Sequence, residues 1–415
     1  MKLQRQFVGA LAALVFSVLP VSSAVAQQKP IKIGFTMALT GGLAGGGKGA
    51  LIAMEIWRDD VNKAGGLLGR PVELVYYDDA TSPANVPGLY TKLLEVDKVD
   101  LLVSAYGTNL IAPAMPIVMR KKMVFPALFG LAANEEFKYD RYFQIMPAGP
   151  SPFTDFSKGF FELAAAQKPK PTTIAIVAAD GEFALNAALG ARKNATSAGM
   201  KIVYDKTYPP ATTDFSPIVR AIQATNPDIV FVGSYPPDSV GIVKAANEIG
   251  LKAKLFGGGM VGLQFAGIQT NLGPLLNGIV NYDFWVPEKT LHFPGVNEFL
   301  AKYRVAAVGK GVDPYGHYLP PYAYAYLQVL GQAVTATKGL DQGKLADHMH
   351  KSTYDTVVGK VKFGKNGEWA TTRVLQVQFR DVQKDNVEQF AGPGKRIVVY
   401  PKEWKSGEMV YPYKQ

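Results

Sequence analysis

The sequence predicts an α/β protein of two lobes, in which parallel sheets carry helices on both faces. The chain has 415 residues, whereas one domain ordinarily holds roughly 100–200. Apolar runs alternate with amphipathic stretches along most of the chain, which is the order of strands and helices in βαβ units. Runs such as Ile174–Val177 and Ile229–Val232 are apolar at successive positions, as strands are when both faces are buried.

The expected elements form two series, separated by a loop at Pro147–Pro152. The expected strands are Ile31–Leu39, Val72–Tyr77, Asp100–Ala105, Met123–Leu128, Thr173–Ala178, Ile202–Tyr204, Asp228–Val232, Leu255–Phe256, Val357–Phe363 and Val374–Phe379. The expected helices lie near Ala50–Lys63, Val86–Val96, Phe156–Gln167, Leu185–Ser197, Ser239–Ile249, Val296–Val308 and Tyr322–Lys338. Because the last two helices would complete the first lobe, we expect residues 30–148 plus 280–356 to form lobe 1. Residues 149–279 plus 357–415 would form lobe 2 and a C-terminal wrap.

The first 26 residues have the pattern of a secretory signal peptide. Lys2 and Arg5 precede an apolar run, Phe7–Val21, and a small-residue cleavage motif ends at Ala26. The apolar run is shorter than the roughly 20 residues of a membrane-spanning helix, and Pro20 interrupts it. The chain contains no cysteine, so neither disulfides nor a lipidated N-terminal cysteine can be formed. We therefore expect export to a Gram-negative periplasm.

Composition and motifs argue against nucleic-acid binding and against nucleotide binding. The net charge is +10, but the basic residues are scattered and not interleaved with stacking aromatics. The loop Gly41–Gly49 nearly reproduces a phosphate-binding loop, yet Gly49 stands where the magnesium-binding Ser or Thr must be. The loop more simply supplies a tight turn with exposed N–H groups before a helix.

Catalytic and metal-binding patterns are also missing from the sequence. The four histidines do not have metal-ligand spacing, since His348 and His350 would point to different faces of a helix. A nucleophile elbow and a thiol nucleophile are both absent. Asp78 and Asp79 follow a strand, where a turn explains them better than acid–base chemistry does. We expect no enzyme activity, no metal and no cofactor.

The order of short motifs resembles the periplasmic leucine/isoleucine/valine-binding proteins, which are solute-binding components of ABC importers. The motifs are Ile31–Gly34, Leu39–Gly41, Gly65–Gly69, Tyr77–Asp79, Asp180–Phe183, Asp214–Ser216, Asp228–Val230, Gly250–Leu251, Tyr354–Gly359 and Gly364–Gly367. The resemblance implies the type I periplasmic fold, with two doubly wound lobes, a three-strand hinge and a ligand cleft between the lobes. It also implies a monomer whose partners are a small-molecule ligand and an ABC transporter permease in the membrane.

The resemblance further implies which positions contact the ligand. A carboxylate would be held by Tyr106, Gly107 and Thr108 after the third strand, and by N–H groups at Ala127–Phe129 after the fourth strand. Thr108 precedes a helix that starts near Leu110, where N–H groups lack partners. Helix capping by Thr108 and Asn109 is the alternative. Aromatic walls in the second lobe would come from Phe183 and Tyr235, although core packing explains such residues equally well.

Two departures from the family pattern bear on the ligand. Amino-acid binders carry an acidic residue for the ammonium group, but the matching stretch Phe256–Met260, which includes Gly259, has no carboxylate. Gly46 stands where they have an aromatic residue, so we expect extra room there. Because an unpaired buried ammonium is costly, these departures predict an aromatic or apolar carboxylic acid.

Other functions remain open from the sequence alone. They are a binder of branched-chain or other amino acids, with Glu182 or Asp238 pairing the amine, a binder of amides or urea, and a soluble receptor that reports its ligand to a membrane sensor. An exported hydrolase or deaminase is disfavoured, because it would need the nucleophile or metal ligands that the sequence lacks.

Overall fold

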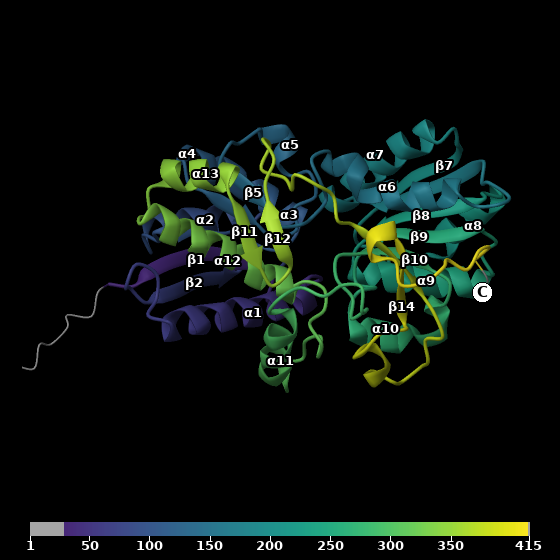
Figure 1. Cartoon of the computed structure of the whole chain (residues 1–415). Helices are drawn as coiled ribbons and strands as arrows, with labels where there is room; N and C mark the ends of the chain where they lie inside the picture. Colours follow the sequence, from purple (N-terminus) through teal and green to yellow (C-terminus); the bar gives the residue numbers. More distant parts are fainter. Residues whose placement is uncertain (1–28, 414–415) are drawn as a thin grey trace, which may run out of the picture.

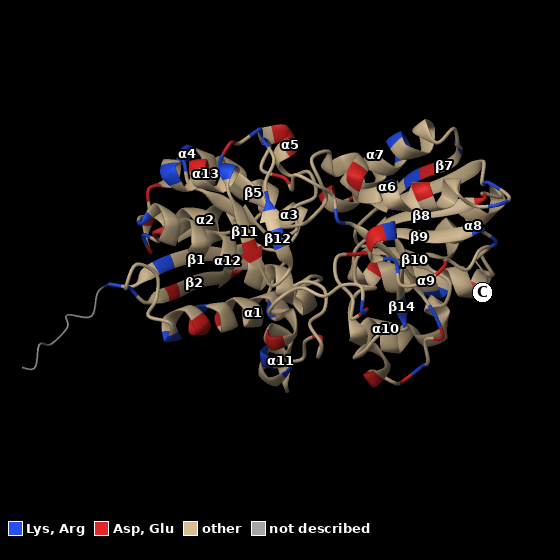
Figure 2. Ribbon diagram, in the orientation of Figure 1, with Lys and Arg blue, Asp and Glu red and all other residues tan. Residues whose placement is uncertain are grey.

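The computed structural model describes residues 29–413, so the signal peptide expected at residues 1–26 lies outside the described residues. Two α/β lobes lie side by side and are joined by a few crossing segments (Figure 1). Basic and acidic residues are interspersed over both lobes (Figure 2). Within residues 29–413, no helix is both long and apolar enough to cross a membrane.

Lobe 1 is built on parallel strands with helices on both sides. The central strand β1 (Ile31–Met37) lies between β2 (Val72–Asp78) and β3 (Leu101–Leu102), and a second parallel pair joins β4 (Phe125–Ala127) to β5 (Tyr142–Gln144). The helices of lobe 1 are α1 (Ala44–Lys63), α2 (Val86–Glu95), α3 (Thr108–Ile111), α4 (Met115–Arg120), α5 (Asn134–Phe137), α11 (Val296–Ala307), α12 (Pro320–Thr337) and α13 (Gln342–Lys351).

Lobe 2 contains a seven-stranded sheet in the order β14-β13-β10-β9-β8-β6-β7. Its strands are β6 (Thr173–Ala179), β7 (Lys201–Tyr208), β8 (Ile229–Ser234), β9 (Leu255–Met260), β10 (Val280–Asp283), β13 (Leu375–Phe379) and β14 (Arg396–Tyr400). Its helices are α6 (Pro152–Ala165), α7 (Glu182–Ser197), α8 (Ser216–Ala224), α9 (Pro236–Ile249) and α10 (Ala266–Leu272). β8 and β9 are buried at every position, so the prediction of parallel strands covered on both faces is confirmed.

The structure contradicts two of the predicted lobe boundaries, the one before residue 280 and the one after residue 356. β10 pairs with β9 and β13, so residues 280–283 belong to the sheet of lobe 2 and not to lobe 1. β12 (Gly359–Lys362) forms a hairpin with β11 (Thr353–Thr356), which packs on α12, so residues 357–362 belong to lobe 1. The predicted boundaries were wrong because a short strand carries no local sign of the sheet that it joins. The helices α4, α5, α8, α10 and α13 and the strands β5, β10, β11 and β14 were not predicted.

Arg373 links the three segments that cross between the lobes. Its backbone N–H donates to the carbonyl of Pro147 at 2.9 Å, and its guanidinium donates to the hydroxyl of Tyr322 at 3.0 Å. That hydroxyl donates to the carbonyl of Phe284 at 3.0 Å. Pro147, Phe284 and Arg373 lie on different crossing segments. These bonds therefore hold the three segments together where they pass between the lobes.

The run Gly257–Gly259 in β9 has a structural cause. Gly257 has φ +140° and Gly258 has φ +108°, which is backbone conformation that favours glycine. A Cβ on Gly257 would lie 1.8 Å from the carbonyl oxygen of Val280, and one on Gly258 would lie 2.4 Å from the ring of Phe231. The glycines therefore allow β9 to pack closely in its sheet.

We predict that Gly257→Ala destabilises the protein strongly. The added methyl group clashes with backbone, which cannot rotate away, so we expect a loss of about 3 kcal/mol or more in the free energy of unfolding. Gly88→Ala is the control, because nothing lies within 4 Å of a Cβ there and helix α2 should gain up to about 1 kcal/mol. Urea denaturation measures both, and equal stabilities of the two variants would contradict this account of β9.

Candidate ligand-binding cleft

A narrow cavity lies between the lobes, where the carboxyl ends of parallel strands meet. This edge is where open α/β sheets bind ligands. The cavity is narrow, and its empty volume of about 330 Å³ includes space that is open to solvent. Its lining residues are Leu43, Tyr106, Gly107, Thr108, Asn109, Phe129, Met146, Phe183, Tyr235, Val261, Tyr282 and Tyr318. Since little free space remains, the lobes must separate, or side chains must move, to admit a ligand.

Six of the twelve lining residues are aromatic, and they come from both lobes. Phe129 of lobe 1 packs against Tyr318 with ring centroids 5.2 Å apart. In lobe 2, Phe183 lies 6.2 Å from Tyr235 and 6.4 Å from Tyr282. None of the twelve is Asp, Glu, Lys, Arg or His. The cavity therefore offers flat apolar surfaces and hydroxyl groups, but no formal charge.

Hydrogen-bond donors lie at the lobe 1 end of the cavity. Thr108 and Asn109 occupy the first turn of α3, where N–H groups have no preceding carbonyl to bond within the helix. The hydroxyl oxygen of Thr108 accepts a bond from the N–H of Leu131 at 3.0 Å, so its own proton is free to be donated. The Oδ1 atom of Asn109 is buried and has no partner among the described residues. The N–H groups and the hydroxyl of Thr108 suit a carboxylate, whereas Asn109 Oδ1 is an acceptor and suits a donor group on the ligand.

Most of the residues expected at the site do line the cavity. Tyr106, Gly107, Thr108 and Phe129 line it from lobe 1, while Phe183 and Tyr235 line it from lobe 2. The N–H groups of Leu128 and Phe129 bond instead to Ser104 Oγ and Gln144 Oε1. Those groups are thus engaged within lobe 1, and the predicted second set of carboxylate donors is not found there.

Ala127, Gly259 and Gly46 were also expected at the site, but they do not line the cavity. Ala127 is buried within β4. A Cβ on Gly259 would face Phe156 and Ala187 in the core of lobe 2, and the cavity is instead lined by the next residue after β9, Val261.

The expectation that Gly46 widens the pocket was wrong. A Cβ there would lie 2.8 Å from Cε1 of Tyr106, so the ring of Tyr106 already fills the space.

Six lining residues were not among the expected contacts: Leu43, Asn109, Met146, Val261, Tyr282 and Tyr318. Leu43 lies in the glycine-rich loop and Asn109 follows Thr108, so both had a local signal. Tyr282 and Tyr318 had none. They reach the cavity only because β10 and the segment before α12 pack together, with their hydroxyl oxygens 2.7 Å apart.

Glu182 and Asp238, the two acids that could pair with an amine, do not line the cavity. Asp238 accepts bonds from the hydroxyl of Tyr208 and the N–H of Tyr235 at the start of α9. Glu182 lies at the start of α7, and its pKa is raised to about 7 by burial and by Glu136 of lobe 1. Close by, Asn186 Nδ2 of lobe 2 donates to the carbonyl of Leu131 in lobe 1 at 2.9 Å. The acids therefore repel each other across the rim where the lobes meet.

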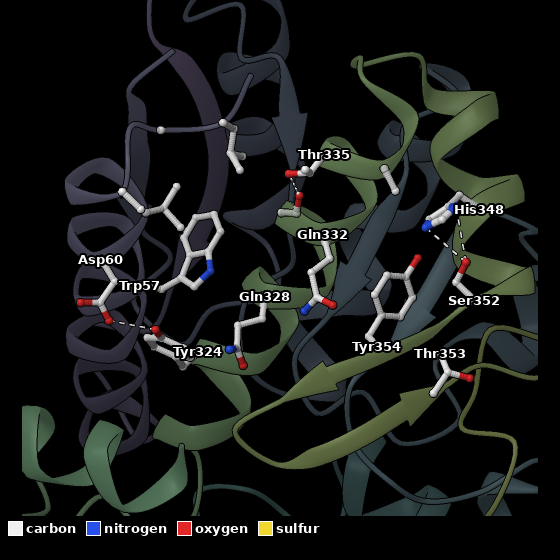
Figure 3. Close-up of a pocket in the computed structure, with 16 residues that line it drawn as sticks. Trp57, Asp60, Tyr324, Gln328, Gln332, Thr335, His348, Ser352, Thr353 and Tyr354 are labelled. Atoms are coloured by element: carbon white, nitrogen blue, oxygen red, sulfur yellow. Dashed lines mark hydrogen bonds between the residues drawn. The ribbon is translucent and has the colours of Figure 1, made fainter. Parts of the chain in front are cut away.

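A larger hollow, of about 1290 Å³, lies on lobe 1 alone. Figure 3 shows Trp57 and Asp60 on one side, Gln328 and Gln332 on α12 in the middle, and Tyr354 on the other side. Several of its polar groups already have partners within the chain: Tyr324 donates to Asp60, and Gln332 donates to the carbonyl of Asp355. The hollow is formed by one lobe, so closure of the lobes cannot enclose a ligand there.

Two facing α/β lobes with a cavity at their strand ends define a solute-binding protein of the type I periplasmic fold. The family model of periplasmic binding proteins matches residues 30–385, and the chain belongs to this family. Members bind small solutes and work with ABC permeases, and the family is one of binding proteins and not of enzymes.

Relatives and solved structures match nearly the whole chain. The Leu/Ile/Val-binding protein homolog 8 of Brucella suis is 26% identical, over 97% of this chain and 97% of its own length. A solute-binding protein from R. palustris in complex with benzoate has TM-score 0.72 and 17% identity, and covers 89% of this chain and 95% of its own. A branched-chain amino acid binding protein from Streptococcus pneumoniae in complex with isoleucine has TM-score 0.71 and 19% identity, and covers 86% and 98%. At these identities the solved structures show the fold alone.

We predict that ligand affinity falls as the pH rises, because Glu182 is buried beside Glu136 when the lobes close. Its raised pKa means that closure takes up a proton between the ordinary glutamate pKa of about 4.3 and about 7. Higher pH therefore opposes closure. Calorimetry with a carboxylate that stays ionised should show several-fold weaker binding at about pH 8 than at about pH 5.5.

Glu182→Gln should remove this pH dependence, because the amide does not titrate. Glu248→Gln, on the exposed surface of α9, should keep it. An unchanged slope of affinity against pH in Glu182→Gln would show that another group titrates on closure.

Proposed function

We propose that this protein captures a small aromatic or apolar carboxylic acid between its lobes in the periplasm and delivers it to an ABC permease. The observation that carries the proposal is an aromatic cavity whose lining includes no acidic side chain. An α-amino acid would bury its ammonium group there without an anionic partner, and that desolvation costs several kcal/mol.

A carboxylate, in contrast, finds donors in the cavity. The N–H groups at the start of α3 and the hydroxyl of Thr108 can donate to its oxygens. The six aromatic rings supply flat apolar contact for the rest of the ligand. The benzoate-bound structure from R. palustris is consistent with such a ligand on this fold.

Binding of branched-chain amino acids is the second candidate. It is favoured by the name of the Brucella suis relative and by the isoleucine-bound structure. An amine in this cavity would have only neutral partners, such as the unpaired Oδ1 of Asn109 and the tyrosine hydroxyls. Because neutral oxygens offset the loss of hydration less well than a carboxylate does, we place this candidate second.

We predict that 3-phenylpropanoate binds more tightly than phenylalanine or leucine. The three ligands isolate the effect of the amino group, since 3-phenylpropanoate is phenylalanine without it. In one calorimetric series, the two amino acids should bind at least about tenfold more weakly, which corresponds to about 1.4 kcal/mol. Micromolar binding of leucine or phenylalanine, together with no binding of 3-phenylpropanoate, would establish the amino-acid candidate instead.

We also predict that Thr108→Val weakens carboxylate binding by about one to two decades, because one hydrogen bond to a charged group is worth about 1.5–3 kcal/mol. Thr108→Ser keeps the hydroxyl and should retain affinity. Valine also removes the acceptor for the N–H of Leu131, so thermal unfolding of both variants must accompany calorimetry. Equal affinities of the folded Val and Ser variants would exclude the hydroxyl from the site.

A further inference from the structure

The loop of residues 129–132 follows β4 and borders the cavity on the side of lobe 1. Phe129 and Ala132 both have left-handed backbone, with φ +62° and φ +56°. This conformation is costly for a residue with a side chain, and it persists only where the surrounding structure holds it. A four-residue loop with two such positions is therefore shaped by its contacts and resists local rearrangement.

Two side chains of lobe 1 hold this loop. Gln144 of β5 accepts a bond from the N–H of Phe129 at 3.1 Å and donates to the carbonyl of Gly130 at 2.7 Å. The hydroxyl of Thr108 accepts from the N–H of Leu131 at 3.0 Å. The side chain of Leu131 is fully buried. The carbonyl of Leu131 is therefore presented from a fixed position beside the residue that we expect to bind the carboxylate.

Asn186 of α7 reaches this carbonyl from lobe 2. Its Nδ2 atom donates to the carbonyl of Leu131 at 2.9 Å, and we call this hydrogen bond the latch. Because it joins the two lobes, it requires them to be closed. Asn186 lies three residues after Phe183, so both are on one face of α7, and Phe183 lines the cavity. The latch thus fixes how close Phe183 comes to the loop that carries Phe129.

The cavity is narrow while the latch is formed. Aromatic rings of both lobes line it, and its empty volume is about 330 Å³. A flat aromatic ring is thinner than a saturated ring with the same number of carbons. A thicker group between the walls would keep α7 away from the loop and stretch the latch beyond hydrogen-bond distance.

We propose that Asn186 selects ligands by their thickness, because the latch closes around a flat aromatic ring and stays open around a saturated one. This inference rests on the proposed function and adds the residue that enforces it. Asn186 is a positioning residue, since it acts through the loop and through α7 and does not line the cavity. The thicker ligand is disfavoured by the bond that it prevents.

Calorimetry with 3-phenylpropanoate and 3-cyclohexylpropanoate tests the proposal on the mature protein. The two acids have the same carboxylate and chain and differ in the saturation of the ring. The wild type should bind the phenyl acid at least about tenfold more tightly. Asn186→Ala should lower this ratio to less than about threefold, because the phenyl acid loses a bond that the cyclohexyl acid never had.

Two further variants separate the latch from general effects of substitution. Asn186→Asp keeps the size of the side chain but cannot donate when it is ionised at about pH 8, so it should lower the ratio as Asn186→Ala does. Asn247→Ala is the matched control, because Nδ2 of Asn247 donates within lobe 2, to the carbonyl of Val243. It should keep the wild-type ratio.

The rate constants and the stability give an independent readout. In Asn186→Ala the phenyl acid should dissociate faster while its association rate stays the same, because the latch forms after the ligand has entered. The melting temperature of the ligand-free protein should not change, since the latch is broken while the lobes are apart.

Three results would overturn the proposal. The first is a wild type that binds both acids equally, which needs no variant to fold. The second is a ratio that survives in Asn186→Ala and Asn186→Asp. The third is an equal loss of affinity for both acids in these variants, which would make the latch a general closing contact without selectivity. All three leave the proposed function standing, whereas a wild type that binds neither acid would refute that function and the inference with it.

Discussion

The carboxyl ends of the parallel strands in both lobes face one another, and this constraint decides where the side chains of the cleft come from. In a parallel sheet every strand ends at the same edge. Residues that follow successive strands are therefore brought together although they are far apart in the chain. The cavity collects Leu43 after β1, Tyr106 after β3, Phe129 after β4, Phe183 after β6, Tyr235 after β8 and Val261 after β9.

The crossing segments determine how far apart these two edges stand. Arg373 bonds to Pro147 and, through Tyr322, to Phe284. Its guanidinium also lies 4.6 Å from the ring of Phe293 and 4.8 Å from that of Trp369. Cation–π contacts of this kind hold a charge that is 6% exposed. These contacts tie the three crossing segments together at one buried residue.

Charge is kept to the rim of the cleft and out of its interior. Glu136 and Glu182 face each other across the rim, whereas the lining residues are neutral. In the function that we propose, affinity comes from ring contacts and from hydrogen bonds donated to the ligand. The rim acids oppose closure, and the bond from Asn186 to Leu131 favours it. In the proposed function, recognition and closure therefore depend on different side chains.

Local pattern determined the α/β class, most strands and the strand-end positions of Thr108, Phe183 and Tyr235, because burial on both faces and helix starts leave local signs. Tertiary structure alone decided the rest. Gly257–Gly259 suggested a missing acid, but close strand packing requires glycine at Gly257 and Gly258. Gly46 suggested space, but Tyr106 fills it. Tyr282 and Tyr318 meet although 36 residues separate them. The physical reason is that contacts between distant segments depend on side-chain packing, which no local periodicity records.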